Sequence, residues 1–192
     1  MAEGGLELAD GRLELRLHLT HPRIPEDISP FWTRSAAVCL SRHHTSPEDF
    51  DVSVRNGERS EYETAWEAPT ADHLRALGSE LNTTEYGAYC VALAAAHAHL
   101  GRMALSRTGA GTGADWWLVP IEADTTGPVE YDLDREDLIK LEVSGVDGRS
   151  EPEMKNRLAK KVAQVQKGRT PVAERYAAVV GFEALEVRMV KV

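Results

Sequence analysis

The chain of 192 residues lacks the features that mark secreted, membrane-spanning or zinc-binding proteins. Its two cysteines, Cys39 and Cys90, lie far apart in apolar segments, so we expect two buried free thiols. No Cys/His spacing is typical of a zinc site. No apolar run approaches the roughly 20 residues that cross a bilayer, and charges interrupt residues 1–19 throughout, unlike a secretory signal. We therefore expect a cytoplasmic protein with no membrane partner.

Basic residues are fewer than acidic residues in this chain. The chain has 22 Lys and Arg against 31 Asp and Glu, a net charge of −9, which argues against a strong electrostatic footprint for nucleic acid. Nucleic acid nevertheless stays open as a partner, because nuclease sites are locally acidic before metal binds and a small basic face can coexist with a negative total. The 42% of hydrophobic and 28% of charged residues are typical of a globular protein.

Alternating apolar and polar residues predict strands in the first third of the chain. Residues 6–19 and 50–66 each alternate on both sides of an Asp-Gly or Asn-Gly pair, so we expect two hairpins. Residues 21–30 hold three prolines and should form a loop, and residues 36–42 are apolar enough for a strand. Residues 1–67 are therefore predicted to be a mostly antiparallel β region that packs on the core.

Residues 68–192 are expected to form a mixed α/β core, because helical and strand-like segments alternate there. Thr70 can cap a short helix, and a capping box from Asn82 to Glu85 opens a longer helix that runs to Gly101. Another helix is expected over residues 151–167, and strands over residues 103–107, 115–120, 138–143, 176–181 and 185–192. The prediction is a central sheet flanked by helices, in helix–strand–strand–strand–helix–strand order.

Three acidic residues could form a carboxylate cluster. Glu85 lies at the end of the helix face that should pack on the sheet, although a Glu three residues after Asn82 also suits a capping box. Asp115 opens a strand after the glycine-rich segment 109–113, and Glu142 faces opposite to its apolar neighbours in a strand that helices should cover. A buried acid needs a partner, since burying it unpaired is costly, and a metal, a lysine or a structural ion pair would serve.

Lysines of the helix over residues 151–167 could supply a cation beside these acids. Lys161 falls just inside one edge of the apolar stripe, Lys155 lies near the opposite edge, and Lys160 points toward solvent. Lys161, or less favourably Lys155, is the candidate cation, and Gln164 could donate a hydrogen bond near the same place. The alternative is a lysine that lies along the sheet with its ammonium in water.

The element order, together with Glu85, Asp115 and Glu142, resembles the PD-(D/E)xK nuclease superfamily over residues 80–192. This resemblance implies that the three acids bind Mg²⁺ or Mn²⁺ and that Asp115, Glu142 and Lys161 are catalytic. Ser144 departs from the family pattern, because it stands where the family has lysine; some members carry that lysine on the following helix instead. The blocks GTGADWWL and LEVSG also look like segments of uncharacterised bacterial proteins.

The resemblance implies one of two functions. The first is a metal-dependent nuclease that acts on nucleic-acid phosphodiesters, in a bacterial defence or mobile-element system. The second is a catalytically inactive nuclease-fold subunit that binds a protein or nucleic-acid partner in a multiprotein bacterial complex, which Ser144 and the acidic total favour. A third interpretation needs only that the acids form structural ion pairs with arginines. The distances among the three carboxylates separate these interpretations.

Overall fold

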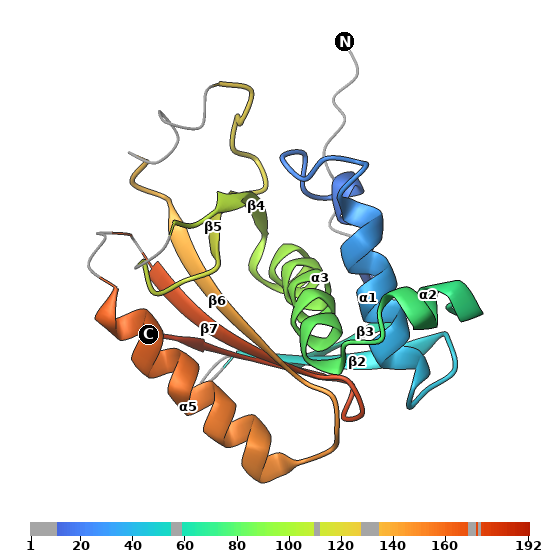
Figure 1. The fold of residues 1–192 in the computed structure, drawn as a ribbon. Coiled ribbons are helices and arrows are strands. Elements are labelled where there is room, and N and C mark those ends of the chain that lie inside the picture. Colours follow the sequence, from blue (N-terminus) through green and yellow to red (C-terminus); the bar gives the residue numbers. More distant parts are fainter. Residues whose placement is uncertain (1–10, 55–58, 110–111, 128–134, 169–171, 173) are drawn as a thin grey trace.

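A curled, mixed sheet of eight strands forms the centre of the molecule, in the order β1-β3-β2-β8-β7-β6-β5-β4 (Figure 1). The computed structural model describes residues 11–54, 59–109, 112–127, 135–168, 172 and 174–192. The strands are β1 (Arg12–Leu13), β2 (Glu48–Val54), β3 (Arg59–Thr64), β4 (Arg102–Arg107), β5 (Trp116–Pro120), β6 (Ile139–Val146), β7 (Glu174–Gly181) and β8 (Glu186–Lys191). The described helices are α1 (Ser29–Ser41), α2 (Ala71–Ala76), α3 (Glu80–Leu100), α5 (Glu151–Lys167) and a 3-10 turn at Leu17–Leu19. The predicted mixed α/β class, with helices packed on a central sheet, is confirmed.

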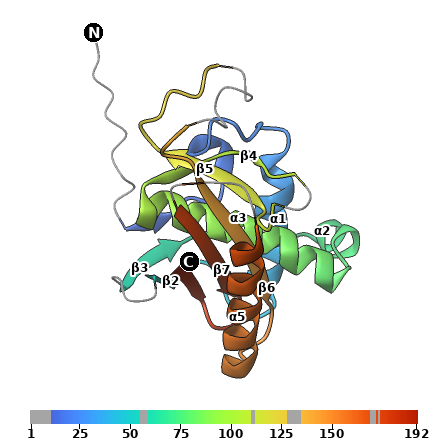
Figure 2. The ribbon, with the colours of Figure 1, turned by 90° about the vertical axis from the view of Figure 1, so that its left-hand side faces the viewer.

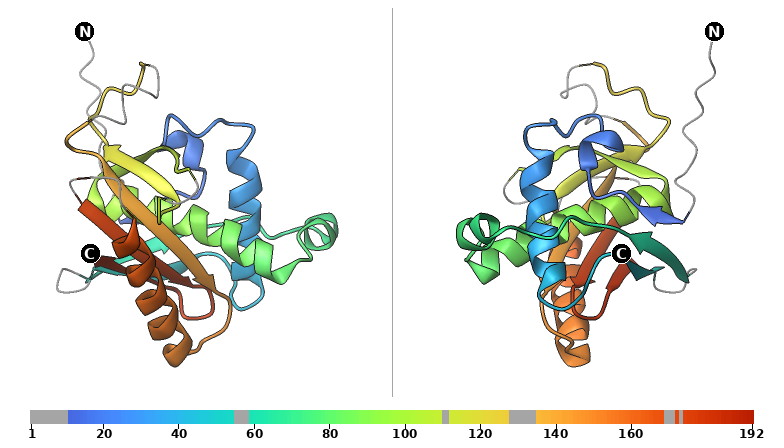
Figure 3. Two further views of the ribbon diagram at one scale, coloured as in Figure 1. Left: turned by 60° about the vertical axis from the view of Figure 1, so that its left-hand side comes forward. Right: turned by 90° about the vertical axis from the view of Figure 1, so that its right-hand side faces the viewer.

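The helices cover the two faces of the sheet unequally. Helix α3 packs on one face and α1 packs on α3, while α5 covers the opposite face at β6 and β7 (Figures 2 and 3). Successive side chains of β6 point to opposite faces of the sheet. Leu141 and Val143 join the large core beneath α3, whereas Val146 packs with Met154 of α5. Glu142 therefore lies on the α5 face, opposite to its apolar neighbours as the alternation predicted.

The hairpin predicted over residues 50–66 is confirmed. Strands β2 and β3 pair antiparallel, with Phe50 opposite Tyr62, and the predicted turn between them lies outside the described residues. Strand β2 also pairs in parallel with β8, so this hairpin continues the same sheet as the carboxyl-terminal strands.

The strand predicted over residues 36–42 is wrong, because residues 36–41 belong to helix α1 and Arg42 caps its end. Every residue from Ala36 to Leu40 is buried, on a helix whose Ala36 backbone lies against Gly87 of α3. An apolar run this short does not distinguish a buried strand from a buried helix, since both bury it completely. The first third of the chain is therefore not purely β.

The hairpin predicted over residues 6–19 is wrong in its second arm, and its first arm lies outside the described residues. Only Arg12–Leu13 is a strand, and it pairs in parallel with β3; Leu17–Leu19 is a 3-10 turn. Leu13, Leu15 and Leu17 are buried because this segment packs on α1, α3 and β3, whereas Leu19 is half-exposed. The loop predicted over residues 21–30 extends only to Ile28, where α1 begins.

Four of the predicted helix ends are correct and one is wrong, and α5 has both of its predicted ends, Glu151 and Lys167. Thr70 caps α2 by accepting a hydrogen bond from the His73 backbone N–H (3.3 Å), and α3 ends at Gly101, whose φ is +61°. The capping box predicted at Asn82 is wrong, because α3 already begins at Glu80. Glu85 consequently lies inside the helix rather than at its cap.

Strand β5 leaves β6 early, and this divergence positions the candidate site. The two strands pair only from Trp116 opposite Leu141 to Leu118 opposite Ile139. Among the described residues, no strand pairs with that side of β6 from Glu142 to Val146, although β7 pairs with the other side throughout. β6 thus runs past the end predicted at Val143, and its free edge lies between α3 and α5.

Both cysteines are buried free thiols, as expected, and burial raises the pKa of each to about 12. None of the described helices is long and apolar enough to cross a membrane.

Candidate functional site at the free edge of β6

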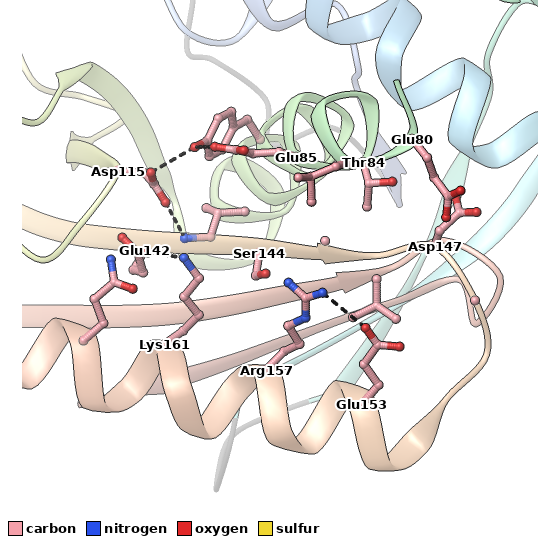
Figure 4. A pocket seen from close by; sticks show the side chains of 17 residues that line it. Glu80, Thr84, Glu85, Asp115, Glu142, Ser144, Asp147, Glu153, Arg157 and Lys161 are labelled. Atoms are coloured by element: carbon pink, nitrogen blue, oxygen red, sulfur yellow. Dashed lines mark hydrogen bonds and ion pairs between the residues drawn. The ribbon is translucent and has the colours of Figure 1, made fainter. Parts of the chain in front are cut away.

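A cavity of about 620 Å³ follows the free edge of β6 between the two helices (Figure 4). Its lining comes mainly from α3 (Glu80, Thr84, Glu85, Tyr89), from β6 and the loop after it (Glu142 to Gly148), from α5 (Glu153, Arg157, Lys161, Gln164) and from Asp115. All three predicted acids and the preferred lysine therefore border one cavity. Asp115, Glu142 and Lys161 gather at one end, and Glu80, Asp147 and Glu153 at the other (Figure 4).

Asp115 lies at the point where the two strands separate, and its carboxylate occupies the gap. Its backbone N–H donates to the Leu141 carbonyl (3.0 Å), which continues the ladder by one residue. Its Oδ2 accepts from the Val143 backbone N–H (2.9 Å), and its Oδ1 accepts from the Tyr89 hydroxyl (3.0 Å). The side chain therefore satisfies a β6 amide that β5 no longer reaches, and both carboxylate oxygens are held in place.

Glycine brings the segment before Asp115 against the end of α5. Gly113 has a φ of +70°, and a Cβ there would lie 2.6 Å from the Gln164 carbonyl oxygen. No other residue accepts both the left-handed backbone and this close approach without strain. Gly113 thus lets the backbone before Asp115 pack closely against the end of α5.

Glu142 is the buried member of the pair, with 1% of its surface exposed. Burial and then the neighbouring Asp115 charge raise its pKa to about 7, against a lowering effect of Lys161. Lys161 forms an ion pair with Glu142 Oε1 from the facing helix. The structure therefore brings Asp115, Glu142 and Lys161 together on the same side of the sheet.

Glu85 is separated from Asp115 by the hydroxyl group of Tyr89. The Tyr89 hydroxyl contacts Glu85 Oε1 (2.7 Å) as well as Asp115 Oδ1, and burial followed by the Glu85 hydrogen bond raises the tyrosine pKa. A hydroxyl has one proton, so it donates to one of these carboxylates at a time. Within the described part of the chain, no group of three or more His, Cys, Asp or Glu residues is arranged to hold a metal.

The other polar residues of α5 occupy different places. Lys155 pairs with Glu151 (3.1 Å) and its side chain is 72% exposed, so it does not reach the carboxylates. Lys160 borders a neighbouring cavity, and Gln164 borders both cavities. Ser144 lies two residues after Glu142 on the same face of β6 and also borders both, beside Lys161.

The sequence did not single out two side chains that hold the site together. Tyr89 connects Glu85 with Asp115, and its position four residues after Glu85 on the same helix face was the available signal. The Arg107 guanidinium lies over the Tyr89 ring (4.5 Å to the centroid) and 3.7 Å from Asp115 Oδ1. Its proximity follows from the pairing of Arg107 with Trp116, a register that the sequence does not reveal.

The fold and the site define a mixed α/β protein with a carboxylate pair and a lysine at the unpaired edge of a central strand. No family model, no curated protein and no solved structure matches the chain. The resemblance to the PD-(D/E)xK superfamily therefore stays a prediction that rests on the motif residues.

Proposed function

We propose that the chain is a metal-dependent nuclease-like protein that acts on nucleic-acid phosphodiesters at Asp115, Glu142 and Lys161. The observation that carries this proposal is the meeting of two carboxylates, one of them fully buried, with a single lysine at the cavity. Lys161 pairs with Glu142, while Asp115 has a long ion pair of 3.7 Å with Arg107, whose side chain is half-exposed and screened by water. A divalent cation is the ligand that would complement the remaining charge.

The donor set suits Mg²⁺ or Mn²⁺. Hard cations prefer carboxylate oxygens, and Mg²⁺ is usually bound through one or two carboxylates together with waters and substrate phosphates. Asp115 and Glu142 would hold the ion, with Glu85 as an outer acid beyond Tyr89. A bound metal would lower the pKa of its water and stabilise the charge that develops on the scissile phosphate.

The chain's own residues have separate tasks in this proposal. The Val143 N–H holds one oxygen of Asp115, and the Tyr89 hydroxyl holds the other when its proton points to Asp115 rather than to Glu85, so that carboxylate is oriented before any ligand arrives. The Lys161 ammonium is held beside Glu142, where it can orient the attacking water or offset charge on the phosphate. Helix α5 thus supplies the lysine that Ser144 cannot.

A second candidate function is a catalytically inactive subunit that binds a protein or nucleic-acid partner. Two observations favour it: Ser144 stands in the lysine position, and both acids already have partners without a metal. In that case Glu142 and Lys161 would form a structural ion pair, and the cavity would bind the partner. Metal binding separates the two functions.

Calorimetry with Mg²⁺ and Mn²⁺, beside cleavage assays on single- and double-stranded DNA and RNA, tests the proposal. We expect Asp115→Asn and Glu142→Gln to lose both metal binding and cleavage, because each removes a charge that hard cations need. Lys161→Met should retain metal binding and slow cleavage. Affinity should rise with pH and level off above about 7, since Glu142 must lose its proton before it binds the cation.

Glu80→Gln is the matched control, because Glu80 borders the same cavity at the opposite end. It should leave metal affinity within twofold of the wild type. If the chain binds no metal at millimolar concentration and cleaves none of the substrates, the nuclease proposal is wrong. The inactive-subunit function would then be favoured.

A further inference from the structure

A second cavity of about 510 Å³ adjoins the metal-site candidate on the α5 side. We name it the α5 cavity; its lining includes Arg157, Lys160, Lys161, Asn156 and Gln164, with Glu153 as the acid at its margin. Among the described lining residues, three basic side chains stand against one acidic one. In a chain of net charge −9, this is a local reversal of sign.

The basic residues of the α5 cavity share one side of the helix. Arg157, Lys161 and Gln164 are separated by four and three residues, so they stand one above another, with Lys160 adjacent. Lys161 contacts Glu142 of β6, which holds its ammonium toward that strand. Arg157 contacts Glu153 (3.3 Å), four residues earlier on α5, and lines both cavities. The cavity therefore offers positioned donors: a guanidinium, two ammonium groups and two amides.

This donor set fits a phosphate group. Guanidinium binds phosphate through two parallel hydrogen bonds, ammonium adds charge, and amide N–H groups supply neutral donors. The acids at Asp115 and Glu142 repel a phosphate until a cation binds, so attraction for an anionic strand must come from beside them. Ser144 borders both cavities, which makes the α5 cavity continuous with the candidate reaction site.

We propose that the α5 cavity binds a backbone phosphate of a nucleic-acid strand next to the phosphodiester at Asp115 and Glu142. This inference rests on the proposed function and adds to it the place and direction of the substrate strand. Glu80, Asp147 and Glu153 gather at the far end of the main cavity (Figure 4). Glu80 and Asp147 repel further phosphates there, so the strand runs beside Arg157 and Lys160 of α5 rather than past Glu80 and Asp147.

Fluorescence anisotropy with the full chain, a labelled single-stranded DNA of ten nucleotides and EDTA tests the proposal without metal. Arg157→Gln/Lys160→Gln should weaken binding at least tenfold. The slope of log K against log salt should fall by about 0.7, the value for one lost phosphate contact to a single strand. The matched control is Lys155→Gln/Lys167→Gln, which removes two charges from the same helix outside both cavities and should change affinity less than twofold.

The anisotropy results test phosphate binding in the α5 cavity, and they do not depend on whether the chain cleaves nucleic acid. Equal losses in the two double variants, or none in either, would overturn the inference, because position on the helix would then not matter. Inorganic phosphate that binds the wild type as tightly as the oligonucleotide does would also overturn it, since the ligand would be a free anion. Asp115→Asn should raise oligonucleotide affinity in EDTA, because it removes a charge that repels phosphate, although it should abolish metal binding. A failed metal or cleavage assay therefore does not decide the result for the α5 cavity.

Discussion

At the scale of single residues, the unusual feature is an acid buried in the centre of a sheet. Glu142 is 1% exposed and has its ion-pair partner on another element, since Lys161 arrives from α5. Removing one member of a buried pair leaves an uncompensated buried charge, whereas replacing both members leaves no buried charge. The energetics of this pair can therefore be separated by a double-mutant cycle.

We predict that Lys161→Met lowers the free energy of unfolding by about 3 kcal/mol at pH 8. Glu142→Gln/Lys161→Met should recover most of that loss, because neither charge remains buried. The loss should shrink at pH 5, since a Glu142 with a pKa raised above its ordinary value is protonated there. Urea denaturation at both pH values, without divalent metal, measures these differences.

The direction in which stability changes with pH follows from proton binding by Glu142. Between its ordinary pKa of 4.5 and the raised value of about 7, Glu142 is protonated in the folded chain and ionised in the unfolded chain. The folded state binds more protons in that window, so the contribution of Glu142 to stability falls as pH rises through it. Lys155→Met is the control on the same helix, since its exposed, solvent-screened pair with Glu151 should contribute far less to stability than a buried pair. A Lys161→Met loss no larger than the Lys155→Met loss would contradict the prediction.

At the scale of secondary-structure elements, the site depends on how closely α3 approaches β6. Gly145 lies where they meet, and a Cβ there would stand 2.6 Å from the Thr84 carbonyl oxygen and 2.7 Å from Thr84 Cγ2. Backbone cannot move away as a flexible side chain can, so the helix itself would have to shift. Such a shift would displace Tyr89, which holds Asp115 from the same helix.

We predict that Gly145→Ala destabilises the chain by about 2 kcal/mol, the typical cost of overpacking a core. It should also weaken metal binding, because Asp115 loses the contact that α3 provides. Denaturation and calorimetry on the same preparation measure the two effects. Gly109→Ala is the control: no atom lies within 4 Å of a Cβ at that position, so its stability should match the wild type within about 0.5 kcal/mol. Equal stability of the two variants would show that α3 and β6 tolerate the methyl group.

At the scale of the whole molecule, the first 67 residues share the core of the rest. Strand β2 pairs with β8, and α1 packs against α3. One apolar cluster contains Leu40 of α1, Phe50 of β2 and Leu93 of α3. Apolar surface on α3 and β8 therefore depends on the amino-terminal segments for its burial.

We predict that residues 68–192 alone do not fold cooperatively, because removing α1 and β2 exposes α3 and the edge of β8 to water. The full chain should show a single sigmoidal thermal transition by circular dichroism, and the shortened chain should lose it and associate in size-exclusion chromatography. A monomeric fragment with a sharp transition would contradict this prediction and would show that the carboxyl-terminal core is independent.

The sequence by itself determined the elements whose ends carry strong local signals. The Thr70 cap, the end of α3 at Gly101 and the hairpin over residues 50–66 depend on backbone chemistry within a few residues. Alternation alone was also enough to place Glu142 on the face opposite to its neighbours. The sequence alone also suggested Asp115 and Lys161 as companions of Glu142, although their proximity is not a local property.

Only the tertiary structure decided what those residues contact. Residues 36–41 form part of a helix because α3 offers a surface on which a helix can bury them, and no local signal distinguishes that outcome from a strand. The same holds for Asp115 opposite β6, for Tyr89 between two acids and for Lys161 rather than Lys155 beside Glu142. Strand register and helix approach set these contacts, and both arise from packing between segments distant in the chain.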